Sequence, residues 1–361
     1  LYGQNTSMAG VTVGMREGML MNIENPAGLT ALDSCKLFAE ASAFVKNERY
    51  RSDGSSSSAF TGNFSAFSLG GRIMRRWYMS VGVTPYSFVG YYFKSSQELE
   101  GSPGTFVTST FSGTGGLSKA FLSQGFSLTK HLSVGMNLNF IFGNMTQNEI
   151  QSAMTVSREM SGRSFYADFG LQYHRPIARE TFLTVGAIYG YKQRISLKNT
   201  VTVTGSSTET PYNQKRVTQY LPQYIGIGSS LAHKKWTYAL DYLFRQYGVL
   251  NSSDSRVKFR DSHELRLGVC YFPNGFSSSS YWKRMSYKAG VSVSTPYLRL
   301  KGQSGGAYRV SVGLGLPVLN GRINTAFYYD RLQLQGNALR RDIMGFTVTY
   351  TLSEKFYQVK L

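Results

Sequence analysis

One stretch of the chain, residues 132–142, restricts more than any other what this protein can fold into. Large apolar side chains and small or polar side chains alternate along it, with Ile141 as the exception. The apolar set is Leu132, Val134, Met136, Leu138, Phe140 and Phe142, and the other set is Ser133, Gly135, Asn137 and Asn139. Because successive side chains of a β-strand point to opposite faces, this strand has one apolar face and one polar face.

The same alternation recurs along nearly the whole sequence, too often for ordinary surface strands of a soluble sheet. It therefore predicts an all-β fold, a 14-stranded antiparallel transmembrane β-barrel, since single-chain outer-membrane barrels have an even number of strands. The predicted strands are 36–46, 58–70, 76–93, 106–128, 131–143, 163–174, 181–198, 216–232, 235–247, 259–272, 285–298, 306–316, 321–332 and 342–353.

Composition agrees with a membrane barrel. Aromatic residues make up 14% of the chain, glycine supplies 38 residues, and only 16% of residues are charged. Membrane barrels use aromatic residues for girdles at the membrane interface. The mean hydropathy of −0.23 does not argue against the membrane, because only every second residue of a barrel strand faces lipid.

The connections between the predicted strands differ in length at the two ends of the barrel. The long, polar connections are 47–57, 94–105, 144–162, 199–215, 248–258, 299–305 and 333–341. The opposite connections are short (71–75, 129–130, 175–180, 233–234 and 317–320), with 273–284 as the exception. Outer-membrane barrels have long extracellular loops and short periplasmic turns, so we expect the N-terminus on the periplasmic side of a Gram-negative outer membrane.

Tryptophan and basic residues gather at the short-turn end. Trp77, Trp236 and Trp282 each stand at or just before the start of a strand that follows such a turn, which predicts an interface girdle. Basic residues accompany them: Arg72, Arg75, Arg76, Lys130, Arg175, Arg179, Lys234, Lys235, Lys283 and Arg284. Taken together they favour anionic lipid headgroups at the periplasmic rim as partners, although each alone is also an ordinary solvated turn residue. The net charge is +19, but the basic residues form no recognition motif for nucleic acid.

Charged residues of both signs fall on the inward parity of the predicted strands. They are Asp168, Asp241, Arg245, Glu264, Arg266, Lys288, Arg309 and Asp330. Two interpretations remain open for this charge ladder. The residues either line a permeation path or form ion pairs that hold a plug to the wall, since unpaired charge away from water is costly.

Residues 1–35 do not alternate, and they precede the barrel of residues 36–361. A barrel of this size must be filled by water or by a plug, and this segment is long enough to be that plug. Its run from Leu20 to Leu29, with the turn Asn25, Pro26, Ala27 and Gly28, resembles the N-terminal hatch of FadL-type long-chain fatty-acid transporters. The resemblance implies a plugged 14-stranded barrel that captures hydrophobic molecules at its outer face and passes them through or beside the hatch.

Four methionines of this hatch, Met8, Met15, Met19 and Met21, have two possible roles. They either form an adaptable apolar pocket for a hydrophobic ligand or pack the hatch against the wall, because methionine fills irregular gaps. Asn25 and Pro26 are expected to set a rigid turn.

Catalytic, metal-binding and cofactor motifs find little support in the sequence. Barrel hydrolases need a histidine with a nucleophile or acid nearby on the barrel. His131, His174 and His233 fall at short turns, and His263 shares the lipid-facing parity of its strand, so we expect each to make a polar contact at the interface. Cys35 and Cys270 have no metal-binding spacing, and we expect both to be free thiols. We expect no cofactor and no enzymatic activity.

Two functions follow from these observations. The first is passive uptake of small hydrophobic compounds through a FadL-like barrel. The second is a non-transporting barrel that acts with other outer-membrane proteins as a scaffold in a larger secretion or protein-assembly complex.

Overall fold

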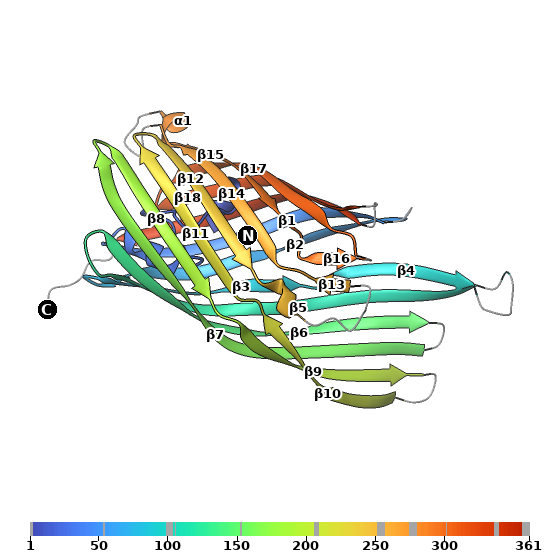
Figure 1. The fold of residues 1–361 in the computed structure, drawn as a ribbon. Helices are drawn as coiled ribbons and strands as arrows, with labels where there is room; N and C mark the ends of the chain where they lie inside the picture. The colour runs from blue at the N-terminus through green and yellow to red at the C-terminus, as the bar shows by residue number, and fades with distance from the viewer. Residues whose placement is uncertain are drawn as a thin grey trace.

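The computed structural model describes residues 3–52, 55–98, 104, 106–151, 154–205, 209–250, 257–273, 280–300, 302–335 and 339–355. Within them the chain forms a closed antiparallel barrel of fourteen spans (Figure 1), as the alternation predicted. The barrel closes where its first strand pairs with its last, from Lys36 opposite Lys355 to Arg51 opposite Arg340. None of the helices among these residues has the length and apolar character needed to cross a membrane.

Nine spans are single strands, and five consist of two strands separated by a short break. The single strands are β1 (Lys36–Ser52), β2 (Ser55–Met74), β5 (Phe106–Ser127), β6 (Leu132–Gln151), β7 (Met154–Ala178), β12 (Trp236–Arg245), β17 (Gly305–Val318), β18 (Gly321–Leu334) and β19 (Arg340–Lys355). The divided spans are β3 (Trp77–Phe88) with β4 (Tyr91–Glu98), β8 (Thr181–Gly190) with β9 (Gln193–Thr204), β10 (Glu209–Leu221) with β11 (Tyr224–His233), β13 (Val257–Phe259) with β14 (Ser262–Tyr271), and β15 (Ser286–Ser294) with β16 (Leu298–Leu300).

The breaks in two of the divided spans contain proline. Pro222 lies between β10 and β11, and Pro296 lies between β15 and β16. Proline has no backbone N–H to donate to a neighbouring strand, so the ladder is interrupted there. After its break, β16 pairs with β13 in a separate small sheet.

The two faces of the wall have the predicted character. On β6, Ser133 and Asn139 are fully buried inside, whereas Phe140 is 42% exposed on the outer face. Ile141 points inward with the polar residues and is also fully buried. The alternation in the sequence therefore placed the side chains of this strand on the correct faces. Ile141, the exception in the pattern, does face inward.

The prediction that the long polar connections are loops is wrong for most of their length. β1, β6 and β7 continue through much of 47–57 and 144–162, and β9 and β10 continue through much of 199–215. Figure 1 shows these hairpins extending together from one end of the barrel. A strand outside the lipid needs no apolar face, so its backbone pairing continues after the alternation stops. The tips 53–54, 99–103, 105, 152–153 and 206–208 lie outside the described residues.

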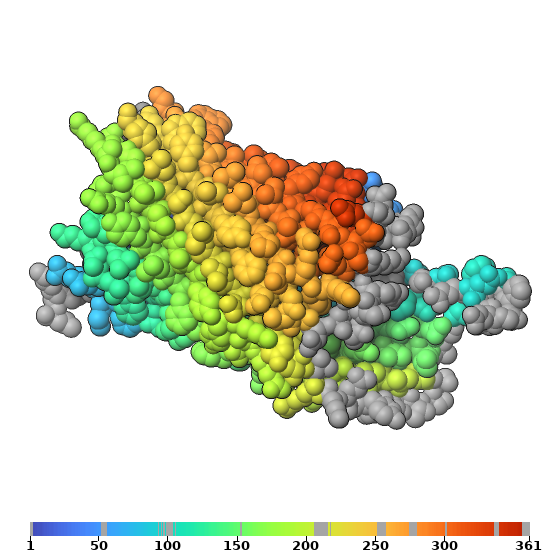
Figure 2. Space-filling view, viewed as in Figure 1, coloured from blue at the N-terminus to red at the C-terminus, as the bar shows by residue number. Residues whose placement is uncertain are grey.

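The hairpins are longer than a membrane crossing requires. β7 has 25 residues and β5 has 22, whereas about 9–11 residues cross a bilayer. Figure 2 shows the end of the β4–β5 hairpin, in cyan, standing clear of the continuous wall. At the opposite end the strands are joined by the predicted short turns, for example at Lys234 and Lys235 between β11 and β12.

The tryptophans lie at the short-turn end of the barrel. Trp77 is the first residue of β3, where it stacks on Phe126, and Trp236 is the first residue of β12. Trp282 lies in a helical turn, α1 (Tyr281–Arg284), just before β15. It is 70% exposed there.

Residues 3–35, here called the plug, lie inside the barrel, except that Asp33, Ser34 and Cys35 are exposed where the plug leads into β1. The plug contains two short 3-10 helices, η1 (Gly3–Met8) and η2 (Pro26–Ala31), and no strand, as the missing alternation indicated. η1 contacts β1, β14, β15, β17, β18 and β19, while η2 contacts β3, β5, β6 and β7. The plug therefore reaches across the lumen from one side of the wall to the other.

Candidate functional site: the plug and the barrel wall

A belt of inward glycines forms the surface on which the plug lies. At each of these glycines an added Cβ atom would come closer than 3.0 Å to a plug atom, so any side chain would displace the plug. Several face each other directly across neighbouring strands, as Gly135 does with both Gly125 and Gly170. The members of this glycine belt are Gly125, Gly135, Gly170, Gly186, Gly228, Gly268, Gly290 and Gly313.

The Asn25–Gly28 turn docks on the part of the belt formed by β5 to β8. Asn25 caps η2 by accepting a hydrogen bond from the Ala27 N–H at 3.2 Å, and Pro26 takes the first helical position. The Asn25 amide also donates to the Val13 carbonyl at 2.7 Å and to the Leu171 carbonyl on β7 at 3.2 Å. One side chain thus caps the turn and ties it to the wall.

Asp241 on β12 binds the plug backbone. Its carboxylate accepts the N–H groups of Thr12 at 2.7 Å, Val13 at 2.9 Å and Gly14 at 3.4 Å. On the adjacent β11, the Ser230 hydroxyl donates to the Gly14 carbonyl at 2.7 Å. Asp241 is fully buried, and its charge is compensated by these three donors.

Arg266 on β14 is the centre of an ion-pair network that joins the wall to the plug. Its guanidinium donates to the Gly10 carbonyl at 2.6 Å, to Glu24 of the plug at 3.2 Å and to Glu264 at 2.8 Å. Arg245 completes the network through Glu264 at 2.7 Å. Burial raises the pKa of Glu24, but the charges of Arg266 and Arg245 and the hydrogen bond from the Thr12 hydroxyl together outweigh burial and hold that pKa below its usual value.

A second ion pair joins Glu17 of the plug to Arg322 on β18. Burial raises the pKa of Glu17, but Arg322 and the nearby Lys288 outweigh it and lower that pKa to about 2. Arg16 beside it donates to Gln172 on β7 at 3.3 Å, and burial lowers the pKa of Arg16 to about 10. Neighbouring plug residues are therefore held by widely separated strands.

The structure divides the predicted charge ladder. Asp241 and Arg266 bind the plug directly, Glu264 and Arg245 support Arg266, and Lys288 lies near Glu17. Asp168 instead accepts hydrogen bonds from Asn137 at 2.5 Å and Asn139 at 2.8 Å, and Asn137 also donates to the plug carbonyl of Ile23. Arg309 and Asp330 pair with each other.

The four methionines do not gather in one place. Met8 and Met15 pack with Val11, Leu20 and Ala239, and Cys270 lies against this cluster. Met19 and Met21 belong to a second cluster with Leu29, Leu32, Phe38 and Tyr78. All four are at most 7% exposed, and both clusters join plug to wall. Met19 also lines a cavity of about 850 Å³ at the short-turn rim.

An apolar layer inside the barrel was not foreseen. Ile141 packs there with Leu117, Tyr166, Ile195 and Leu221, which come from β5, β6, β7, β9 and β10. The break in parity at Ile141 was the signal in the sequence. This layer is the apolar surface that a hydrophobic molecule entering the lumen from the hairpin side would meet.

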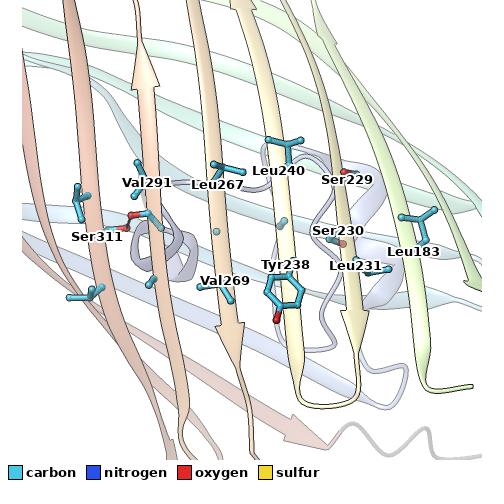
Figure 3. Close-up of a pocket in the computed structure, with 16 residues that line it drawn as sticks. Leu183, Ser229, Ser230, Leu231, Tyr238, Leu240, Leu267, Val269, Val291 and Ser311 are labelled. Atoms are coloured by element: carbon cyan, nitrogen blue, oxygen red, sulfur yellow. Dashed lines mark hydrogen bonds between the residues drawn. The ribbon is translucent and has the colours of Figure 1, made fainter. Parts of the chain in front are cut away.

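The outer wall carries a shallow apolar depression of about 540 Å³ over β8, β11, β12, β14, β15 and β17. Figure 3 shows Leu231, Tyr238, Leu240 and Leu267 side by side on these strands, among the residues that line it. Leu240 and Leu267 are 42% and 51% exposed, so the depression opens toward the lipid and not into the lumen. Small outward residues, Ser229 and Ala289, leave room between the larger ones.

The remaining candidate residues lie at the rims or on the outer face. His131 in the turn between β5 and β6 lies beside His174 on β7. His233 at the end of β11 is hydrogen-bonded to Thr181 at the start of β8, and His263 contacts the Tyr242 hydroxyl on the outer face. Cys35 is exposed, Cys270 is partly buried, and both are free thiols. Over the described part of the chain, no three His, Cys, Asp or Glu side chains are grouped so as to hold a metal ion.

This architecture defines a class, the transmembrane β-barrel closed from within by its own N-terminal segment. The chain belongs to the BamG family, whose model matches residues 2–360. A search of curated proteins gave no match.

Solved structures share the fold. The Ralstonia pickettii toluene transporter TbuX is 13% identical, with a TM-score of 0.63 over 98% of each chain. The Pseudomonas putida toluene transporter TodX is 15% identical, with a TM-score of 0.63 over 98% of this chain and 97% of that one. A Pseudomonas aeruginosa FadL homologue is 12% identical, with a TM-score of 0.62 over 98% of each chain. The resemblance to FadL-type barrels is thereby confirmed for the fold, and the family is BamG.

Proposed function

We propose that this protein is a non-transporting barrel that serves as a fixed scaffold subunit in a larger outer-membrane assembly. The observation that carries the proposal is the attachment of the plug to the wall. Plug atoms form hydrogen bonds or ion pairs with β1, β6, β7, β11, β12, β14, β17, β18 and β19. A neutral hydrogen bond contributes about 1 kcal/mol and one to a charged group about 1.5–3 kcal/mol, so moving the plug costs many times the thermal energy.

Exposed apolar side chains on the long hairpins supply a surface for partners. Tyr92 is 65% exposed, Phe106 is 64% exposed, and Ile150 and Met154 are 43% and 46% exposed. Phe106 lies 21 residues from the short-turn end of β5, about 70 Å along the strand at about 3.3 Å per residue. Apolar groups this far beyond an apolar band about 25 Å tall are exposed to water, where a partner protein would cover them.

The orientation is part of this proposal. The hairpins face the cell exterior and the short turns face the periplasm, which the tryptophans and basic residues at the turns support. In intact cells, an impermeant maleimide should label a Ser57→Cys variant in the β1–β2 hairpin. It should label the natural Cys35 only after the outer membrane is opened, and the reverse pattern would invert the orientation.

A purification under gentle detergent tests the scaffold function. The tagged chain should be recovered with a constant set of partner chains, and a Tyr92→Ser/Phe106→Ser/Ile150→Ser variant should lose them while remaining folded. Leu319→Ser is the matched control, because Leu319 is fully exposed at the opposite end. Recovery of the wild-type barrel alone would contradict the proposal.

Passive uptake of small hydrophobic compounds is the second candidate. The structural similarity to toluene transporters and the apolar layer around Ile141 support it. Vesicles that contain the purified chain should then accumulate labelled toluene faster than empty vesicles. Replacing Ile141 with Asn should reduce that difference, and uptake equal to empty vesicles would exclude this function.

A further inference from the structure

Four arginines stand together on the outward face where β18, β19 and β1 meet. Asp342 on β19 lies between Arg49 on β1 and Arg331 on β18 in the strand register. One outward position further from the short turns, Arg340 lies directly opposite Arg51. These residues share the parity of outward-facing Met344 and Phe346 on β19 and of Phe327 on β18, so their side chains emerge on the outer surface of the barrel.

The positive charge of this cluster exceeds its negative charge. Asp342 accepts hydrogen bonds from Arg331 and Arg340 at 2.8 Å each, and from the Tyr329 hydroxyl at 2.7 Å. In the described part of the chain, Arg49 and Arg51 have no carboxylate within ion-pair distance. Four guanidinium groups against one carboxylate leave an excess of three positive charges.

The direct opposition of Arg51 and Arg340 is unfavourable in the barrel alone. Residues directly opposite in an antiparallel pair have Cβ atoms about 4.5–5.5 Å apart, and like charges there destabilise the pairing. An anion bound between the two side chains would convert this repulsion into two charge-assisted interactions.

The cluster lies at the edge of the membrane-facing band. The outward residues of β1 below it, from Leu37 to Val45, are aliphatic, and Asn47 follows before Arg49. From Leu37 to Arg49 the chain advances about 40 Å along the strand at about 3.3 Å per residue. At a tilt of about 40° this is about 30 Å across the membrane, just beyond the apolar band of about 25 Å in outer-membrane barrels. The arginines therefore stand at headgroup depth, in the leaflet on the hairpin side.

We propose that Arg49, Arg51, Arg331 and Arg340 bind the phosphate groups of a membrane lipid headgroup. The planar guanidinium group presents paired donors that match phosphate oxygens, and three excess charges suit a lipid that carries more than one phosphate. Met344, Val45 and the other outward apolar residues below the cluster would contact the acyl chains of the same lipid. The site is separate from the plug and does not depend on the scaffold function.

Native mass spectrometry of the full-length barrel in detergent tests this site. Diphosphorylated lipid A is the probe, and monophosphorylated lipid A, phosphatidylcholine and inorganic phosphate are the comparisons. The test variant is Arg49→Gln/Arg51→Gln/Arg340→Gln, which leaves the Arg331–Asp342 pair in place. The control, Lys94→Gln/Arg158→Gln/Lys258→Gln, removes equal charge from other exposed positions of the hairpin end.

We expect the wild type and the control to bind diphosphorylated lipid A at least tenfold more tightly than phosphatidylcholine. The test variant should lose most of this preference, and the corresponding three lysine substitutions should keep an intermediate affinity. A heat-dependent shift in gel migration verifies that each variant is folded. Equal lipid A binding by the wild type and the test variant would overturn the proposal, and inorganic phosphate binding as tightly as lipid A would overturn the assignment to a lipid.

Discussion

At the scale of single residues, the plug is held by buried charges whose partners lie on different strands. The Asp241 carboxylate accepts hydrogen bonds from three backbone N–H groups of the plug. Arg266 forms an ion pair with Glu24 and donates a hydrogen bond to a backbone carbonyl of the plug. Removing one partner leaves the other buried and unpaired, which costs more than the intact interaction contributes. Part of the inward charge in this barrel therefore binds the plug to the wall.

Acid should weaken this attachment through Glu17. Its pKa is about 2 in the folded protein and has an ordinary value of 4.5, so its ion pair contributes stability that is complete above pH 4.5. That contribution should decrease as the pH falls from about 4.5 to about 2, by about 1–3 kcal/mol. Thermal unfolding of the wild type and Glu17→Gln measures it. A difference between the two proteins that stays constant from pH 6 to pH 2.5 would contradict this assignment.

Substitution in the glycine belt should displace the plug. A Cβ at Gly170 would overlap Asn25 and Pro26, so Gly170→Val should destabilise plug docking by about 1–3 kcal/mol. Limited trypsin digestion should then cut after Arg16, which the wild-type barrel shields. Gly306→Val is the control, because no atom lies within 4 Å of a Cβ there. Equal protection of Arg16 in all three proteins would show that the belt does not position the plug.

At the scale of elements, the sequence located the strands but not the ends of the hairpins. Alternation is a consequence of lipid on one face of the wall, so it marked the membrane-crossing part of every span. Beyond the lipid that requirement ends, and the polar residues of 144–162 gave no sign that β6 and β7 continue. The glycine belt could not be predicted from the sequence either. Inward glycines such as Gly135 are required by the close approach of the plug, which only the structure shows.

The hairpin extensions should be dispensable for barrel folding. Replacing residues 147–158 with Asn-Gly removes the outer part of the β6–β7 hairpin, in which Gln147 pairs with Arg158. We expect the melting temperature to change by less than about 5 °C, because none of the described residues of this segment is buried and little apolar surface is lost. Gel migration with and without heating reports folding. Loss of the folded barrel would mean that the extension is required for closure of the wall.

At the scale of the whole molecule, the barrel consists of a lipid-facing wall, an internal plug and an outer set of hairpins. The predicted class of fold and the lumenal position of residues 3–35 follow from where alternation occurs and where it stops. The contacts of the plug could not be predicted, because they join residues far apart in the chain, such as Arg322 with Glu17. Under the proposed scaffold function, the hairpin end is the part that the molecule presents to partners, while its interior is occupied by its own chain.

Ion conductance in planar bilayers tests most directly the central claim that the plug is fixed. The wild-type chain should remain closed, because its lumen is filled by residues held on nine strands. A variant that lacks residues 1–31 should open a stable channel, and adding an Asp241→Asn substitution to the full chain should produce intermittent opening. Steady conductance through the wild type equal to that of the deletion variant would contradict the claim.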